Sequence, residues 1–249
     1  MCDTCGCGDP EVVPVDVHDT ILAGNNRTAA HNRDHFRERG VVAINLMGSP
    51  GAGKTAILEA TARLVAGREG PPSTGRRLGA LAGDLATDHD ADRLQAAGIA
   101  AKSITTGSAC HLDAAMVHRG LHDFPWRELD YLFIENVGNL VCPAVYDLGQ
   151  EANVVALSVT EGVDKPLKYP VMFLKADLVL ITKIDLLPHL PEIRIEAIAD
   201  ALARVMPRPA FLPVSARTGA GMDGWIDWLA RVPRPRPASA AEAHAGHHQ

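Results

Sequence analysis

One segment near the start of the chain constrains its fold more than any other. An apolar run at residues 41–47 leads into residues 48–55, which match the pattern G-x-x-x-x-G-K-[ST], and a helix-forming stretch follows. Glycines allow such a loop to turn its backbone N–H groups toward a phosphate, at a helix N-terminus that already favours anions. Lys54 would then reach the β- and γ-phosphate oxygens, and Thr55 would place its hydroxyl on Mg²⁺. This strand–loop–helix context predicts a nucleoside triphosphate site.

Apolar runs alternate with helical stretches from residue 41 onward. This alternation predicts an α/β fold of the P-loop NTPase type, with a mostly parallel sheet flanked by helices on both faces. The expected strands are residues 41–47, 78–82, 100–105, 131–134, 154–159, 178–182 and 211–214. The expected helices are residues 54–66, 90–97, 112–121, 193–205 and 222–232, with a further helical segment at about 19–39.

These elements divide the chain into one domain with two tails. We expect a metal-binding N-terminal leader and helix at 1–40, a P-loop GTPase domain at 41–233, and a disordered tail at 234–249 that carries His244, His247 and His248. Residues 67–77, rich in Gly, Pro and Ser, are expected to form a surface loop.

Charge and hydropathy exclude two classes of partner. The net charge is −6 and no basic tract is present, so we expect no nucleic-acid binding. No apolar run approaches the roughly 20 residues that span a bilayer, and no signal peptide is recognisable, so we expect no membrane association and a cytoplasmic location.

Two carboxylates are expected at the same edge of the sheet as the phosphate loop. Glu135 ends an apolar run and would hold Mg²⁺, with Gly138 three positions later placed to contact the γ-phosphate. Asp84 follows another strand and would position Mg²⁺ or the attacking water, because ligands bind beyond the carboxyl ends of parallel strands. The alternatives are an exposed Glu at a strand end and a helix cap at Asp84. Lys54, Asp84 and Glu135 are the candidate catalytic residues.

The base is predicted to be guanine rather than adenine. Thr182-Lys183-Ile184-Asp185 is similar to the Asn-Lys-x-Asp element of GTP-binding proteins, with Thr in place of Asn. Asp185 can accept from both N1–H and the exocyclic amine of guanine, and adenine offers no such pair of donors. Ser215 and Ala216 lie in a segment that is similar to the fifth element of the same proteins. The candidate nucleotide-binding residues are Gly48, Ser49, Pro50, Gly51, Ala52, Gly53, Lys54, Thr55, Ala56, Gly138, Lys183, Asp185, Ser215 and Ala216.

The five cysteines fit metal binding better than disulfide bonding. An odd number cannot all pair within one chain, and Cys2, Cys5 and Cys7 are crowded at the N-terminus. Three thiolates with the α-amino group suit square-planar Ni²⁺, and the same thiolates with water or His suit tetrahedral Zn²⁺. A redox or disulfide motif is the alternative.

Cys110, His111 and Cys142 form a second candidate site. Both loops that carry them should emerge at the nucleotide-facing edge of the sheet, so we expect the three side chains to converge on nickel or zinc. An isolated cysteine is more often a small buried hydrophobe, which is the alternative for each of the two.

Taken together, these blocks resemble the hydrogenase-maturation nickel-insertion GTPases, the HypB family. The resemblance runs from Cys2 to the segment of Ser215 and rests on residues 48–55, 83–84, 87, 90–93, 106–107, 110–114, 135–143 and 161–170. It implies a SIMIBI-class GTPase that binds GTP, Mg²⁺, Ni²⁺ and Zn²⁺. It further implies a nucleotide- and metal-dependent homodimer, a tight nickel site at Cys2, Cys5 and Cys7, and delivery of Ni²⁺ to the large subunit of nickel–iron hydrogenase with a small zinc- and nickel-binding partner.

Two alternatives to that function stay open at this point. One is a related GTPase that serves another metalloenzyme, of the urease or cobalamin type; the other is a nickel-storage or metal-sensing protein. Asn139 follows Gly138 and is shorter than the Gln that orients water in some GTPases, so we expect slow intrinsic hydrolysis.

Overall fold

The computed structural model describes residues 15–66, 76–84, 89–107 and 109–235. Cys2, Cys5 and Cys7, most of the expected surface loop at 67–77, and His244, His247 and His248 lie outside the described residues. The predictions made for them therefore stay predictions.

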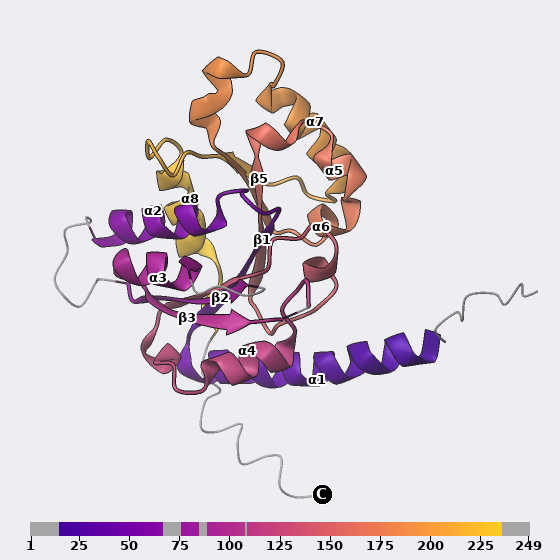
Figure 1. Cartoon of the computed structure of the whole chain (residues 1–249), viewed down its shortest axis with the longest axis vertical. Helices are drawn as coiled ribbons and strands as arrows, with labels where there is room; N and C mark the ends of the chain where they lie inside the picture. The colour runs from indigo at the N-terminus through magenta and orange to yellow at the C-terminus, as the bar shows by residue number, and fades with distance from the viewer. Residues whose placement is uncertain (1–14, 67–75, 85–88, 108, 236–249) are drawn as a thin grey trace, which may run out of the picture.

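A seven-stranded parallel sheet forms the centre of the described chain (Figure 1). Its spatial order is β3-β2-β4-β1-β5-β6-β7, and every neighbouring pair runs parallel. The strands are β1 (Val42–Gly48), β2 (Leu78–Asp84), β3 (Ala100–Thr105), β4 (Tyr131–Glu135), β5 (Ala152–Ser158), β6 (Leu178–Thr182) and β7 (Phe211–Pro213). β1 lies between β4 and β5 and is buried along its whole length, as expected of an apolar run in a sheet covered on both faces.

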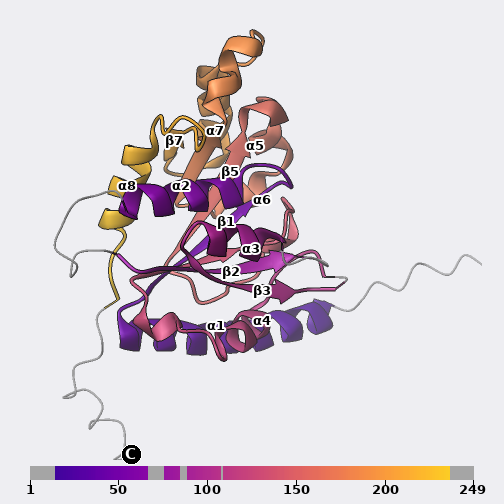
Figure 2. The same cartoon turned by 60° about the vertical axis from the view of Figure 1, so that its left-hand side comes forward.

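Helices cover both faces of the sheet (Figure 2). Side chains alternate across β1, so that Ile44 and Leu46 pack with α2 (Lys54–Ala66), α3 (His89–Ala96) and α8 (Met222–Arg231) on one face. Val41 and Ala43 belong to the opposite face, which is covered beside β1–β4 by α1 (Val15–Arg39) and α4 (Ala114–Leu121). The same face is covered beside β5 and β6 by α5 (Lys165–Lys168), α6 (Pro170–Leu174) and α7 (Ile195–Val205). Short 3₁₀ helices occupy Trp126–Glu128, Cys142–Ala144, Val159–Glu161 and Ile184–His189.

The predicted α/β fold of the P-loop NTPase type is confirmed, with small shifts at element ends. The sheet is fully parallel within the described chain, and α5 and α6 are elements that the sequence analysis did not predict. α4 begins at Ala114 rather than at residue 112, because the Asp113 carboxylate caps the helix by accepting from the Met116 N–H at 2.6 Å. Leu112 is thereby left outside the helix, fully buried against the sheet.

The carboxyl ends of β1, β2, β4 and β6 meet at one edge of the sheet. This edge carries the phosphate loop, Asp84, Glu135 and Thr182, as expected for a ligand site in an open parallel sheet. Among the described residues, no helix is both long and apolar enough to cross a bilayer.

Candidate nucleotide site and metal cluster

The phosphate loop borders a cavity of about 460 Å³ at this edge. Lys54 lies inside the loop with its side chain almost fully buried, and its ammonium group donates to the carbonyls of Gly48 at 3.3 Å and Ser49 at 3.2 Å. Burial lowers the pKa of Lys54, and the nearby carboxylates of Glu135, Asp90 and Glu161 oppose that shift. A phosphate group entering this cavity would meet a cation that is already held by the loop.

Next to Lys54, the Thr55 hydroxyl lies between two carboxylates. Its oxygen is 2.8 Å from Glu135 Oε1 and 3.0 Å from Asp90 Oδ1. Burial raises the pKa of Glu135 to about 7, and its second oxygen, Oε2, is buried without a hydrogen-bond partner among the described residues. An unpaired buried carboxylate oxygen beside a hydroxyl and a second acid is a donor set that fits Mg²⁺, which prefers oxygen ligands.

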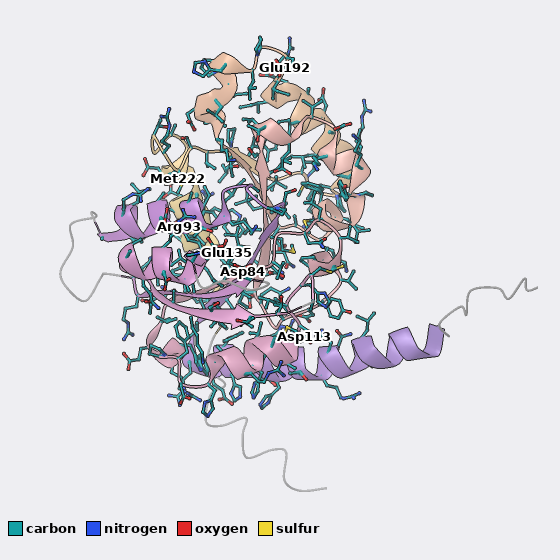
Figure 3. All side chains as sticks on the ribbon, in the orientation of Figure 1. Asp84, Arg93, Asp113, Glu135, Glu192 and Met222 are labelled. Atoms are coloured by element: carbon teal, nitrogen blue, oxygen red, sulfur yellow. The ribbon has the colours of Figure 1, made fainter. Side chains whose placement is uncertain are left out.

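The structure places the predicted Thr55, Glu135 and Asp84 around one cavity and adds Asp90 to them. Asp84, at the end of β2, lines the cavity together with Glu135 and Arg93, and these three labelled side chains lie near one another in Figure 3. Sequence reasoning gave Asp90 no role. The available signal was an acid in the first turn of the helix that follows the strand of Asp84.

A second cavity, of about 480 Å³, adjoins the first. Gly53 and Ala56 line both cavities, and Lys183, Asp185, Ala216 and Arg217 line the second. The first cavity, with Lys54 and carboxylates, matches the phosphate end of a nucleotide. The second cavity, with the two carboxylate oxygens of Asp185 as acceptors, matches the base end.

Asp185 is held in position by two donors. Ser215 Oγ donates to Oδ1 at 2.6 Å and Arg217 Nε donates to Oδ2 at 2.9 Å. The hydrogen bond from Ser215 is the main reason why the pKa of Asp185 lies below its ordinary value, and the bond from Arg217 adds to it. The carboxylate is thus ionised, as it must be to accept from guanine. Arg217 is a residue of this pocket that the sequence analysis left without a role.

Thr182 and Lys183 connect the base pocket to the phosphate loop by hydrogen bonds. Thr182 Oγ1 donates to the Ala52 carbonyl at 2.6 Å, and Lys183 Nζ donates to the Gly51 carbonyl at 2.6 Å. Lys183 has a φ of 59°, a left-handed conformation that is uncommon for a residue with a Cβ. The hydroxyl that replaces the usual Asn side chain at position 182 therefore joins two parts of the site.

Cys110, His111 and Cys142 converge on one point, and we call them the thiolate cluster. The Cys110 thiol donates to the Cys142 sulfur with an Sγ–Sγ distance of 3.0 Å, and His111 Nδ1 lies 3.9 Å from Cys110 Sγ. All three ligating atoms lie within 4.8 Å of one another. With metal–sulfur distances of about 2.3 Å, one ion can contact both sulfurs at this separation.

The ring of His111 is half-buried and packs against an aromatic neighbour. It stacks on Tyr146 with ring centroids 4.0 Å apart, and burial lowers the pKa of His111. The pKa of Cys142 is raised, chiefly by the hydrogen bond from Cys110. A neutral imidazole beside two thiols can bind a thiophilic ion with the release of thiol protons.

The segment between Glu135 and Cys142 connects the thiolate cluster to the nucleotide site. Gly138 packs so closely on the phosphate loop that a Cβ at this position would lie 2.8 Å from the Pro50 nitrogen. Asn139 pairs with Gly48 in an isolated antiparallel bridge. The Asn136 side chain accepts from the Leu112 N–H at 3.1 Å, next to His111. Both loops that carry the thiolate cluster therefore contact residues that line the cavity of the phosphate loop.

Known proteins are similar to this chain in sequence and in fold. Residues 42–212 match the family model of the CobW/HypB/UreG nucleotide-binding domain. The hydrogenase maturation factor HypB of Azotobacter chroococcum is 48% identical over 217 residues, which cover 87% of this chain and 68% of that protein. The HypB of Escherichia coli K12 is 43% identical over 86% of this chain and 71% of its own length. The chain belongs to the HypB family of hydrogenase maturation factors.

Solved structures agree with that assignment. The crystal structure of HypB from Helicobacter pylori in complex with nickel has a TM-score of 0.75 and 37% identity, and the match covers 83% of this chain and 94% of that one. HypB from Archaeoglobus fulgidus also has a TM-score of 0.75, with 39% identity over 84% of this chain and 98% of that one. A LAO/AO transport system kinase, with a TM-score of 0.51 and 17% identity over 85% of this chain and 74% of its own, shares the fold alone.

Proposed function

We propose that this HypB-family chain is a GTP-hydrolysing metallochaperone that carries Ni²⁺ to the large subunit of nickel–iron hydrogenase. One observation supports the proposal more than any other: Cys110, His111 and Cys142 lie within 4.8 Å of one another, and the segment that leads to Cys142 contacts the phosphate loop at Gly138. The nickel complex of the Helicobacter pylori HypB supports nickel as the cargo. Cys2, Cys5 and Cys7 are proposed as a tighter nickel site, and zinc as an alternative occupant of either site.

In the proposed reaction, Lys54 holds the β- and γ-phosphates and Asp185 holds guanine. Thr55, Glu135 and Asp90 would bind Mg²⁺, with Asp84 placed to position the ion or the attacking water. Mg²⁺ held by these residues would supply positive charge to neutralise the charge that develops on the phosphates during transfer. Gly138 would donate its N–H to the γ-phosphate, and loss of that phosphate would release the segment that leads to Cys142.

Intrinsic hydrolysis is expected to be slow. Asn139 is shorter than Gln, and its Oδ1 already accepts from the Val141 N–H at 2.7 Å, which holds the amide oxygen within its own loop. A slow GTPase would keep the ion bound until a partner arrives. GTP hydrolysis by the purified chain at the rate of a metabolic enzyme would contradict this timing.

A homodimer is proposed at the face that carries Cys142. Exposed apolar side chains surround that residue, and α6 packs beside the 3₁₀ helix Cys142–Ala144. The exposed apolar residues of this face are Val141, Val145, Val171 and Leu174. An apolar patch of this kind is typical of an interaction surface. A small zinc- and nickel-binding maturation partner and the hydrogenase large subunit are the further proposed partners, and the cytoplasm is the expected compartment because the thiolate ligands must stay reduced.

The decisive experiment is a Ni²⁺ titration of the full chain with and without a non-hydrolysable GTP analogue and Mg²⁺. The wild-type thiolate cluster should change its Ni²⁺ affinity with nucleotide, and Cys142→Ala should lose about tenfold or more in affinity and lose the nucleotide effect. Glu192→Ala, at an exposed carboxylate outside both the thiolate cluster and the proposed dimer face, is the matched control. A wild-type affinity that is the same with and without the analogue would overturn the coupling.

Urease is the alternative client. The HypB of Helicobacter pylori, 37% identical over 86% of both chains, is described as a hydrogenase/urease maturation factor. Expressing this chain in a host that lacks its own HypB and measuring nickel in hydrogenase and in urease separates the two clients.

A further inference from the structure

Three histidines from two helices form a separate group, which we call the imidazole cluster. His31 and His35 lie one turn apart on α1, and His118 reaches them from α4, which packs alongside α1. The ring centroids lie 4.3 Å apart for His31–His35, 5.2 Å for His31–His118 and 5.9 Å for His35–His118. One ring nitrogen of each histidine lies within 4.8 Å of the other two.

A buried asparagine fixes the tautomer of His118. Asn32 is fully buried, and its amide NH₂ donates to the carbonyls of Ala114 at 2.9 Å and Leu148 at 3.2 Å. The Asn32 oxygen must therefore be the atom that lies 3.0 Å from His118 Nδ1, so Nδ1 carries the proton and donates. This leaves the lone pair of Nε2 free. A second hydrogen bond that fixes the tautomer is the usual companion of a metal-binding histidine.

The three rings border a cavity of about 430 Å³, which leaves room for water. His31 and His118 are exposed, so an ion can enter directly from solvent. Buried Trp126 closes the cavity beneath His35, with ring centroids 6.0 Å apart. Asp123 also lines the cavity and supplies a carboxylate, while the guanidinium of Arg127 rests 4.7 Å from the centroid of Trp126.

We propose that His31, His35 and His118 bind one divalent transition-metal ion of the nickel and zinc class. Imidazole nitrogens suit both ions, and a set of three leaves one or more positions for water. At metal–nitrogen distances of about 2.1 Å, the nitrogens around a tetrahedral ion lie about 3.4 Å apart, so ring nitrogens at the 4.8 Å limit need to close by about 1.4 Å. Rotation of the two exposed side chains supplies that movement.

This site differs in chemistry and position from the thiolate cluster. It contains no sulfur ligand, and it lies on α1 and α4, which cover the face of the sheet opposite to α2, the helix of the phosphate loop (Figure 2). The inference does not depend on the proposed function, since it requires neither GTP nor the thiolates. It gives the chain a third candidate position for a transition-metal ion.

The test counts Ni²⁺ and Zn²⁺ ions bound to the full chain by equilibrium dialysis, with each metal salt added alone. His118→Ala, and separately the pair His31→Ala and His35→Ala, should each lower the stoichiometry by one ion at metal concentrations that saturate the wild type. His122→Ala is the matched control, because His122 lines the same cavity but is not one of the three ligands. An unchanged count in the first two variants, or an equal loss in the control, would overturn the proposal.

A second measurement identifies the ligands. In a chain with all five cysteines changed to serine and with His244, His247 and His248 changed to alanine, Co²⁺ should give d–d bands of a nitrogen- and oxygen-bound ion without thiolate charge transfer. These bands should disappear on adding His118→Ala. If the cysteine-free chain does not fold, as judged by its thermal unfolding, X-ray absorption of the wild type at full zinc loading takes its place. The average number of nitrogen ligands per ion should then fall in His118→Ala and not in His122→Ala, and an unchanged number would overturn the site.

Discussion

The thiolate cluster and the imidazole cluster each bring three ligands together, but they are built on different parts of the fold. Cys110, His111 and Cys142 lie on loops at the carboxyl edge of the sheet, where Gly138 packs on the phosphate loop. His31, His35 and His118 lie within two helices that cover one face. The number of ligands is the same in both, so position decides whether a bound ion can respond to nucleotide.

Each cluster is also tied to a buried asparagine. Asn136 accepts from Leu112 beside the thiolate cluster and donates to Asn45 on the central strand β1 at 3.1 Å. Asn32 accepts from His118 and donates to Ala114. Asn136 and Asn32 therefore bond to the backbone of Leu112 and Ala114, which lie two residues apart at the start of α4. We expect nucleotide to change the ion affinity of the thiolate cluster and not that of the imidazole cluster. Only the thiolate cluster has a ligand, Cys142, on a segment that packs against the phosphate loop.

The largest effect is expected from Lys54→Ala. Loss of a cation that contacts the transferred phosphate should lower GTP hydrolysis by about 100- to 1,000-fold. Both clusters should keep their ions, since Lys54 contacts neither. Single-turnover hydrolysis and Ni²⁺ dialysis on the same preparation check both parts.

Lys175→Ala, at an exposed lysine, is the matched control for that variant. Hydrogenase maturation in cells should fail with Lys54→Ala and continue with Lys175→Ala. Maturation that continues with both variants would favour a storage protein. Nucleotide would then not distinguish the thiolate cluster from the imidazole cluster.

Asp185→Asn is expected to have the next largest effect. The change removes one of the two acceptors for guanine donors and weakens the bonds from Ser215 and Arg217, so GTP affinity should fall by about 10- to 100-fold. Xanthosine triphosphate, which has a carbonyl where guanine has the amine, should regain part of that loss because Asn supplies a donor. Fluorescent-nucleotide titration measures both. Nickel stoichiometry should be unchanged, and a lost ion would show that the base pocket reaches a metal site.

The nucleotide site at the carboxyl edge of the sheet could be predicted from the sequence, because the motifs that form it are short and local. The spacing from Gly48 to Thr55 and the order of apolar runs determine where the loop lies. The rule that loops after parallel strands share an edge was sufficient to bring Cys110 and Cys142 together. The contact of Asp90 with Thr55 could not be predicted, because it depends on how α3 lies against α2.

The imidazole cluster was beyond sequence reasoning for the same reason. The spacing of His31 and His35 was visible, but His118 lies on a helix far along the chain, and nothing local indicates that α1 and α4 pack together. The decisive bond, from His118 to Asn32, depends on that packing.

Glu135→Gln is expected to change stability with a defined pH dependence. The pKa of Glu135 is raised from 4.5 to about 7, so in the metal-free chain the native state holds a proton that the unfolded state releases across this window. Stability should therefore fall as pH rises from about 4.5 to about 7. Gln cannot lose a proton, so the variant should be more stable than wild type at pH 8 by on the order of 2 kcal/mol, about thirtyfold in the unfolding constant, and equal to it at low pH.

Urea unfolding in a metal chelator at pH 4.5 and pH 8 measures this difference. Glu151→Gln, at an exposed carboxylate, is the control and should not gain stability over wild type between pH 4.5 and pH 8. Contributions from all other titratable groups are the same in wild type and variant and cancel in the comparison. A Glu135→Gln chain less stable than wild type at pH 8 would mean that the buried carboxylate is already paired in the metal-free state.

The smallest effect, and the sharpest test of the comparison, is expected from Gly138→Ala. The new Cβ would lie 2.8 Å from the Pro50 nitrogen, so the backbone must shift where the segment between Glu135 and Cys142 contacts the phosphate loop. The change in Ni²⁺ affinity caused by a GTP analogue should shrink about threefold at the thiolate cluster, a fraction of a typical coupling energy. It should stay absent at the imidazole cluster. Gly24→Ala is the control, since its Cβ would meet a single atom, Arg27 NH2, at 4.0 Å. If Gly138→Ala altered the ion affinity of both clusters, the start of α4 would be transmitting the change from Asn136 to Asn32, and the two sites would respond to nucleotide together.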